Sequence, residues 1–226
     1  MGGFNVFHLI VWYFAFVVSA TVHEAAHALA ALKLGDPTAH RGGQVTLNPR
    51  PHMKREPWGM IYVPIISFML NGWILGWAST PFSPDWAWRY PKRSALMSLA
   101  GPAANLFLFA LSFLLIRVGL GRGVFEQAGP FSRLIVDGAG IWHPIAMVLG
   151  VFFLLNLILF VLNLIPAPPM DGSSVIMLFM PDNTARQWMV FKNQGMFMLI
   201  TLIVLLYGFR WVFRPILGAA LDLLFR

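Results

Sequence analysis

Five long apolar segments dominate this chain of 226 residues. Each is close to or longer than the roughly 20 residues with which an α-helix crosses about 30 Å of hydrocarbon. Hydrophobic residues make up 58% of the chain and charged residues 11%, a composition unlike that of a soluble domain. The sequence therefore predicts an all-α polytopic membrane protein, a bundle of roughly five to six transmembrane or re-entrant segments. The apolar segments are Phe4–Leu34, Gly59–Ala78, Ala95–Ile116, Ile145–Ile165 and Met196–Phe213.

The connections between these segments indicate the domain organisation. They are polar and rich in Gly and Pro, and the sequence shows no internal repeat, low-complexity tract or soluble appendage. We therefore expect a single integral-membrane domain over residues 1–226, with a motif-bearing core at about 4–181 and C-terminal helices at about 194–226. The connection after the first helix contains GQVTLN, whose alternation predicts a short β-hairpin-like element.

Charge and cysteine content narrow the function further. The net charge is +7, which in a membrane protein favours basic cytoplasmic loops and contact with anionic membrane lipid. Nothing resembles a nucleic-acid-binding motif, so no nucleic-acid partner is predicted. The chain has no cysteine, which excludes disulfides and thiolate metal sites. Any metal must be bound by His, Asp, Glu or backbone oxygen.

The stretch ATVHEAAHALA, residues 20–30, places ionisable side chains inside the first apolar segment. His23 and His27 are four residues apart, so a helix presents both imidazoles on one face. With Glu24 they form H-E-x-x-H, in which the histidines bind zinc and the glutamate is the general base of a metalloprotease. The alternative is a cluster of hydrogen-bonded core residues. A charge at mid-membrane costs roughly 2.5–3.5 kcal/mol, however, so Glu24 needs a partner, and a divalent cation supplies one.

A hydrolytic zinc site usually has three protein ligands, so another ligand is needed. Asp171, in NLIPAPPMDGSS, is the acidic residue within a hydrophobic region of the second half of the chain. Pro166, Pro168 and Pro169 break the preceding helix, and broken backbone at membrane depth is tolerated where it faces a cavity. Asp171 is therefore a candidate ligand. The alternative is a helix end at the interface, with Asp171 as the cap of the next helix.

Three motifs together resemble the site-2 protease family of intramembrane zinc metalloproteases. HEAAH is followed by NLIPAPPMDG, which resembles the family's N-x-x-P-x-P-x-x-D-G, and LAGPAANL resembles its A-G-P-x-x-N helix start. GDPTA…VTLNP…H and GWASTPFSP are similar to connections in short members, which lack PDZ and CBS modules. From LAGPAANL the resemblance implies Asn105 as a weaker substrate-binding or supporting residue. HMKREP departs from the usual acidic continuation, so the resemblance assigns no role to His52.

The resemblance also implies the remaining site residues and the activity. His23, His27 and Asp171 would bind one zinc ion per chain. Glu24 would be the catalytic base, and Asn163 would contact the substrate backbone or the developing oxyanion. The expected activity is that of an intramembrane zinc endopeptidase. Its substrate would be a single-pass transmembrane protein or peptide, cleaved in or near its transmembrane segment.

Topology limits how these motifs can meet. If all five apolar segments crossed the membrane, His27 and Asp171 would finish on opposite sides. Either both motifs lie at mid-membrane, or Gly59–Ala78 enters the membrane and returns without crossing it. Pro64, Asn71 and Gly72 interrupt this segment, which favours the re-entrant path.

With that topology, most basic residues of the connections fall on one side. The positive-inside rule then places the active-site end towards the cytoplasm, with the N-terminus outside, in a prokaryotic inner membrane. The basic residues on the predicted cytoplasmic side are Lys33, Arg41, Arg50, Lys54, Arg55, Arg89, Lys92, Arg93, Arg186 and Lys192.

A second function competes with the protease. A non-catalytic membrane protein, either a transporter or a degenerate protease relative, could also bind metal. Transporters typically contain repeats and several intramembrane carboxylates, which this chain lacks. A degenerate relative is expected to have lost Glu24, which is present. The sequence therefore favours the endopeptidase, and it leaves the oligomeric state open.

Overall fold

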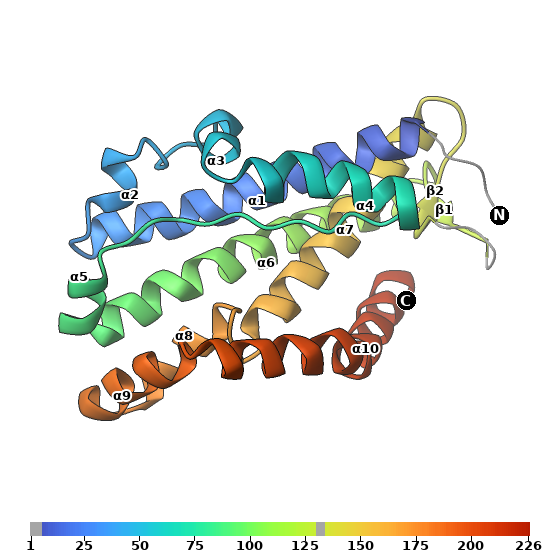
Figure 1. Ribbon diagram of the computed structural model, residues 1–226. Helices are drawn as coiled ribbons and strands as arrows, with labels where there is room; N and C mark the ends of the chain where they lie inside the picture. Colours follow the sequence, from blue (N-terminus) through green and yellow to red (C-terminus); the bar gives the residue numbers. More distant parts are fainter. Residues whose placement is uncertain (1–5, 130–133) are drawn as a thin grey trace.

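The computed structural model of the protein describes residues 6–129 and 134–226. Four helices in this part of the chain are long and apolar enough to cross a membrane. Successive long helices run in opposite directions (Figure 1). This arrangement confirms the predicted all-α polytopic fold. The four helices are α1 (Val6–Lys33), α6 (Pro91–Gly121), α7 (Trp142–Leu164) and α10 (Gly195–Phe225).

Short elements mark the two ends of the bundle (Figure 1). The end with α2 (Thr38–Arg41), α5 (Pro84–Arg89) and α9 (Asp182–Lys192) is called the α2 end below. The opposite end, called the β end, carries the antiparallel strands β1 (Glu126–Gln127) and β2 (Val136–Asp137). Helices α1 and α7 run towards the α2 end, and α6 and α10 run away from it.

Helices α1, α6 and α7 form the packed core. Ala28 and Ala31 on α1 have no exposed surface, and small side chains of this kind allow close approach of a neighbouring helix. Phe153 of α7 lies against Phe109 and Phe113 of α6, with ring centroids 4.9 and 6.3 Å away. These contacts pack α7 against α6, and both helices also pack against α1.

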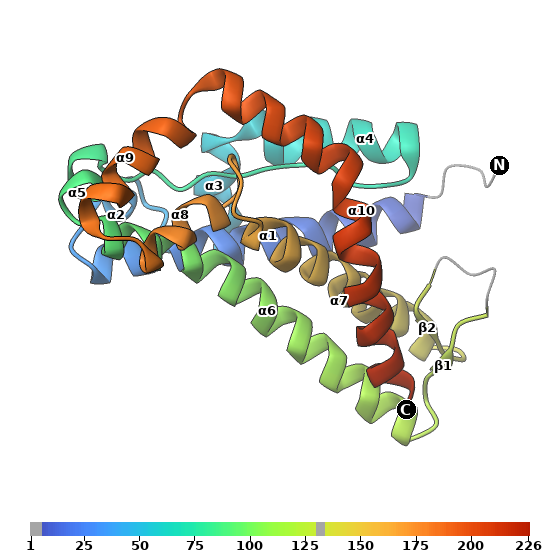
Figure 2. The same cartoon turned by 90° about the horizontal axis from the view of Figure 1, so that it is seen from below.

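Helix α10 stands more apart from this core (Figure 2). Its buried side chains are Leu205 and Leu224, and most of its other apolar side chains are exposed, as expected for a surface that faces lipid. The helix bends along its length and contains Pro215, the residue type that most often kinks a helix. The C-terminal region at about 194–226 is therefore one bent helix rather than several.

The second apolar segment forms a hairpin. The π-helical turn η1 (Trp58–Tyr62) continues into α4 (Val63–Asn71), which ends at Gly72 with φ of 70°. The chain then runs back in an extended path to α5, and residues 73–83 are called the return segment below (Figure 1). Its Trp77 N–H donates to the carbonyl of Gly59 at 3.1 Å. The short helix and this return form a hairpin, the shape that a re-entrant path needs, and the re-entrant path itself stays a prediction.

The predicted β-hairpin after the first helix is wrong. GQVTLN lies between α2 and α3 (Pro49–Arg55) and forms no strand. Local hydrogen bonds replace a ladder: Asn48 N–H donates to Thr46 Oγ1, and the Asn48 side chain caps α3 by accepting from Arg50 N–H. An Asn cap followed by Pro49 at the first helical position is a strong helix start, and it ends the extended stretch before it can pair.

Candidate metal centre

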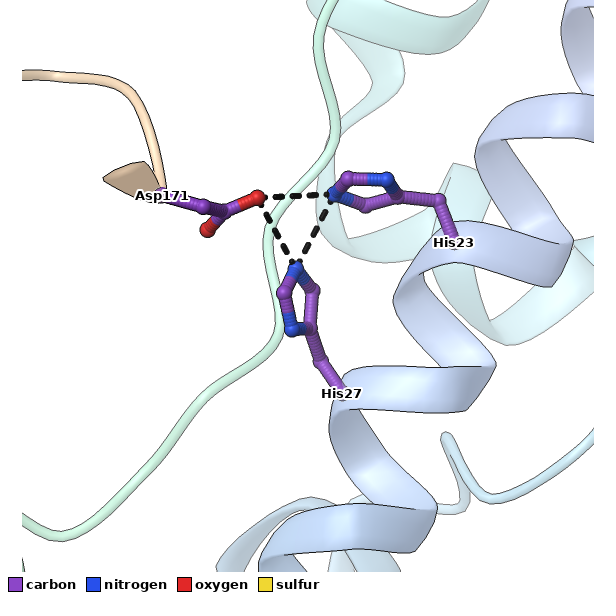
Figure 3. A group of neighbouring side chains, drawn as sticks. All are labelled: His23, His27 and Asp171. Carbon is purple, nitrogen blue, oxygen red and sulfur yellow. Dashed lines mark hydrogen bonds and ion pairs between the residues drawn. The ribbon is translucent and has the colours of Figure 1, made fainter. Parts of the chain in front are cut away.

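Two helix turns of α1 and a loop after α7 meet at one point (Figure 3). The Nε2 atoms of His23 and His27 are 2.9 Å apart. Asp171 Oδ2 lies 3.2 Å from each of them. Within the described residues, these three side chains form the group of His, Asp or Glu whose atoms converge closely enough to hold a metal ion. The four-residue spacing of the histidines on α1 brings the two imidazoles together. The path of the chain after α7 brings Asp171 to them.

The remaining ring nitrogens decide what the site can bind. His23 Nδ1 lies 2.6 Å from Asn105 Oδ1, and His27 Nδ1 lies 2.8 Å from the carbonyl oxygen of Met97. Both oxygens are acceptors, so each Nδ1 carries the hydrogen and each Nε2 presents a lone pair. Two lone pairs and a carboxylate oxygen thus face one another. A metal cation between them would be bound by all three atoms at once.

The size of the triangle fits zinc. Ligand atoms at about 2.0–2.1 Å from a tetrahedral zinc lie roughly 3.3 Å from one another. The observed separations of 2.9 and 3.2 Å are close to that value. Two imidazole nitrogens and one carboxylate oxygen are also a usual donor set for catalytic zinc. The residues present therefore fit this metal.

Asn105 belongs to a buried chain of hydrogen bonds that supports His23. Its Nδ2 donates to Asn156 Oδ1 at 2.9 Å, and Asn156 Nδ2 donates to Ser19 Oγ at 2.9 Å. Asn105, Asn156 and Ser19 have no exposed surface. The structure thus gives Asn105 a supporting position, and its buried amide is not presented to a substrate. Asn156 was not predicted, although an asparagine within the apolar run LLNLILF was a visible signal.

Gly101, in LAGPAANL, lies directly against the two imidazoles. A Cβ atom at this position would lie 2.3 Å from His27 Nε2 and 2.5 Å from His23 Nε2. Any side chain here would therefore displace the ligand atoms. Asn105 follows one helical turn later, so the same face of α6 both makes room for the imidazoles and orients His23.

The loop that carries Asp171 is tied down from several elements. Asp171 occupies the N-cap position of α8 (Gly172–Val175) but makes no capping hydrogen bond, and its carboxylate points to the histidines instead. A Cβ on Gly172 would lie 2.3 Å from the carbonyl oxygens of Leu164 and Ile165, so the loop folds tightly onto the end of α7. The helix-cap alternative therefore describes the position of Asp171 but not the direction of its side chain.

Side chains from α6, α9 and α10 hold this loop and the helix η2 (Ile176–Phe179) that follows it. Trp188 Nε1 donates to the Ser173 carbonyl at 2.6 Å, and Thr201 Oγ1 donates to the Pro168 carbonyl. Lys92 Nζ donates to the carbonyl oxygens at the end of η2. The sequence of NLIPAPPMDG does not indicate these hydrogen-bond partners, which come from distant helices.

A cation also lies near the Asp171 loop. Lys192 Nζ donates to Ser174 Oγ at 2.5 Å. Burial lowers the pKa of Lys192 to about 8, and the charge of Asp171 acts in the opposite direction. Helix α9 thus places a positive charge next to the loop that carries Asp171.

The other predicted residues occupy distinct positions. Glu24 is buried, and its Oε2 accepts a hydrogen bond of 2.7 Å from Thr80 Oγ1. Asn163 is half-buried near the end of α7, and its side chain makes no hydrogen bond with the described residues. His40 is exposed, and His52 is buried with its Nε2 3.1 Å from the Thr46 carbonyl oxygen. Neither of these two histidines belongs to the converging group.

Several bacterial proteins are similar to this chain. It is 32% identical over 207 residues to "Putative zinc metalloprotease YwhC" of Bacillus subtilis, covering 91% of this chain and 85% of that protein. It is 29% identical over 198 residues to "Putative zinc metalloprotease Rip2" of Mycolicibacterium smegmatis, covering 88% and 68%. The Rip2 protein of Mycobacterium tuberculosis strain H37Rv is 33% identical over 193 residues, and the chain spans 63% of its length.

Neither a protein-family model nor a solved structure matches the chain. The similarity to YwhC nevertheless extends over most of both proteins, and at 32% identity it reflects common descent. The chain therefore belongs to the zinc metalloprotease family that includes YwhC.

Proposed function

We propose that this protein is an intramembrane zinc endopeptidase of the site-2 protease type, which hydrolyses peptide bonds in or near the transmembrane segment of membrane-anchored substrates. One observation carries the proposal: His23, His27 and Asp171 present converging acceptor atoms, and both histidines lie within a helix long and apolar enough to cross a membrane. A metal centre of this kind inside an apolar helix favours a substrate that also lies in the membrane. The names of the related metalloproteases support the same reaction.

Zinc would be held by Nε2 of His23, Nε2 of His27 and Oδ2 of Asp171. When bound, the ion supplies a Lewis acid that polarises a substrate carbonyl and acidifies a water molecule. Asn105 and the Met97 carbonyl keep both imidazoles in the tautomer that this binding requires. Gly101 leaves the space that the ligand atoms occupy.

Glu24 is the general base of the proposed mechanism. Its carboxylate accepts a proton from the attacking water and passes it to the leaving amide nitrogen, as a group next to the first ligand of H-E-x-x-H can do. Asn163 is the proposed contact for the substrate backbone, because its amide is half-buried and unused by the described residues.

We propose that the substrate docks on the return segment. The backbone N–H and carbonyl groups of residues 78–82 make no hydrogen bond with the described residues, and Thr80 in this stretch contacts Glu24. A substrate helix must unwind before its amides become accessible, and an unwound segment can pair with an extended neighbour by strand addition. This pairing would bring a substrate peptide close to the general base.

The proposed orientation places the α2 end in the cytoplasm of a prokaryotic cell, in the inner membrane. The basic residues of the connections gather in the elements at or next to this end, which the positive-inside rule assigns to the cytoplasmic side. A single-pass membrane protein is the proposed substrate, and surrounding lipid contacts the exposed faces of α10.

The test compares wild-type protein with Glu24→Gln in detergent, using a set of fluorogenic transmembrane peptides. We expect wild-type cleavage that a chelator abolishes and added zinc restores, and a Glu24→Gln protein that binds one zinc ion without cleaving. Full activity of Glu24→Gln would refute the mechanism. Tight zinc binding by wild-type protein without hydrolysis of any peptide would favour the non-catalytic metal-binding alternative.

A further inference from the structure

The return segment reaches the general base through one side chain. Thr80 Oγ1 lies 2.7 Å from Glu24 Oε2 and 2.9 Å from the Glu24 carbonyl oxygen. Thr80 is half-buried and Glu24 is buried, and the two residues are 56 positions apart in the chain. Within the described residues, Thr80 is the only group that donates a hydrogen bond to the Glu24 carboxylate.

The segment that carries Thr80 is itself fixed on both sides of this residue. Ser79 Oγ donates to Glu56 Oε1 at 2.5 Å and accepts from Arg55 Nε at 3.2 Å, which attaches the segment to α3 and the residue after it. Ser83 N–H donates to Asp36 Oδ2 at 2.7 Å, which attaches the segment to the end of α1. Because the chain is fixed at Ser79 and at Ser83, the position of Thr80 between them is fixed as well.

A glutamate side chain has three rotatable bonds, and a general base works only within hydrogen-bond reach of the proton that it abstracts. We propose that Thr80 is a positioning residue for Glu24. Its hydroxyl holds Oε2 in one place and leaves Oε1 free for proton transfer. The proposal rests on the proposed function, because it assumes that Glu24 acts as the base.

Thr80→Val tests the proposal, because valine keeps the shape of threonine and removes the hydroxyl. The loss of one hydrogen bond to a charged group is expected to lower kcat for a transmembrane peptide about tenfold or more. KM should stay within about twofold of wild type, because the proposed docking uses the backbone of the return segment and not the Thr80 hydroxyl. The zinc content should also stay within about twofold, because this hydroxyl bonds to Glu24 and not to His23, His27 or Asp171. Thr80→Ser restores the hydroxyl and should recover most of kcat.

Thr21→Val is the matched control. Thr21 is on α1, close to the site in sequence, and its buried hydroxyl has no hydrogen-bond partner among the described residues. The same chemical change there should leave kcat unchanged. A loss of kcat in Thr80→Val but not in Thr21→Val assigns the effect to the bond with Glu24.

Other results would overturn the proposal. If Thr80→Val keeps wild-type kcat, loses zinc in parallel with activity, or is not rescued by Thr80→Ser, Thr80 does not position the base. These outcomes are distinct from failure of the proposed function, which would show itself as no cleavage by the wild type or as full cleavage by Glu24→Gln. In either of those cases the proposed role of Thr80 would also be refuted, because it requires Glu24 to act as the base.

Discussion

At the scale of single residues, the metal site depends on Nδ1 of each histidine as well as on the Nε2 atom that faces the metal position. Asn105 Oδ1 fixes the tautomer of His23, and loss of such a hydrogen-bond partner of a metal-binding histidine typically lowers metal affinity about 10–100-fold. Asn105→Leu should therefore weaken zinc binding by about that factor, whereas Asn105→Asp keeps an acceptor and should retain more of the affinity. Competition with a chromogenic chelator measures both. Equal zinc affinity in Asn105→Leu and wild type would contradict the role.

Gly101 gives a second prediction at this scale. A methyl group there would lie 2.3 Å from His27 Nε2, so Gly101→Ala should abolish zinc binding and cleavage. The helix itself should not suffer, because alanine is a better helix former than glycine by about 1 kcal/mol. Gly121→Ala is the control: it lies in the same helix, no described residue comes within 4 Å of the new Cβ, and both properties should stay intact. Normal zinc content in Gly101→Ala would show that the imidazoles can move aside.

The sequence was sufficient to select some of the site residues but not their supports. His23, Glu24, His27 and Asp171 stand in motifs whose spacing or chemistry marks them, and the structure brings the three proposed ligands together. Thr80 could not be selected, because its contact with Glu24 depends on how the return segment lies against α1. The Met97 carbonyl is a backbone group, which no residue pattern can reveal.

At the scale of elements, Asp36 joins the end of α1 to α2 and to the return segment. Its carboxylate accepts from Thr38 N–H, Thr38 Oγ1 and Ser83 N–H. Burial acts to raise the pKa of Asp36, but these hydrogen bonds and the charge of Arg41 outweigh it and lower the pKa below 3.8. A lowered pKa means that the unfolded chain binds the proton more tightly than the folded chain does. The stabilisation is therefore complete above the unfolded value and is lost as pH falls towards the folded value.

Asp36→Asn should lower the thermal unfolding midpoint in detergent at pH 7, because the charge-assisted hydrogen bonds are weakened. The difference from wild type should be constant above about pH 5 and should shrink as pH falls below 3.8. Asp85→Asn removes an exposed carboxylate from α5 and serves as the control, with little change expected. A wild-type advantage that grows at acid pH would contradict the sign of this prediction.

The sequence predicts an element correctly where its apolar length matches the thickness of a membrane. The four long helices follow from apolar length alone. The hairpin formed by residues 59–78 has the shape that a re-entrant path needs, and the re-entrant path itself stays a prediction. The strand prediction for GQVTLN was wrong because an alternating pattern of apolar and polar residues indicates only an extended backbone. A strand also needs a partner, and here Asn48 and Pro49 start a helix instead.

At the scale of the whole molecule, α1, α6 and α7 act as one unit around the site, while α10 adds a largely exposed apolar wall. Each core helix supplies a different part: ligands from α1, space and a histidine partner from α6, and Asp171 through the loop after α7. Asn156 and Ser19 link α7 and α1 directly through their side chains. Because these parts meet only when all three helices are packed, metal binding should report on assembly of the bundle.

The direction in which this bundle lies in the membrane can be tested because the chain has no cysteine. A single introduced cysteine is then the only thiol, and a membrane-impermeant maleimide reports the side on which it lies. Lys54 and Asp85 are exposed and flank the α4 hairpin, and Gln127 is exposed at the β end. With a re-entrant hairpin and a cytoplasmic α2 end, Lys54→Cys and Asp85→Cys should react only in inverted vesicles, whereas Gln127→Cys should react in intact cells.

The labelling pattern separates the two parts of this prediction. If Lys54→Cys and Asp85→Cys react from opposite sides, the hairpin crosses the membrane, and the fold would have to differ from the hairpin in which Trp77 bonds to Gly59. If both react only in intact cells, the hairpin is re-entrant but the α2 end faces outward, against the distribution of basic residues. Cleavage by each variant shows that the labelled protein is folded. Because Glu24 contacts the return segment through Thr80, a crossing hairpin would also separate the base from its partner.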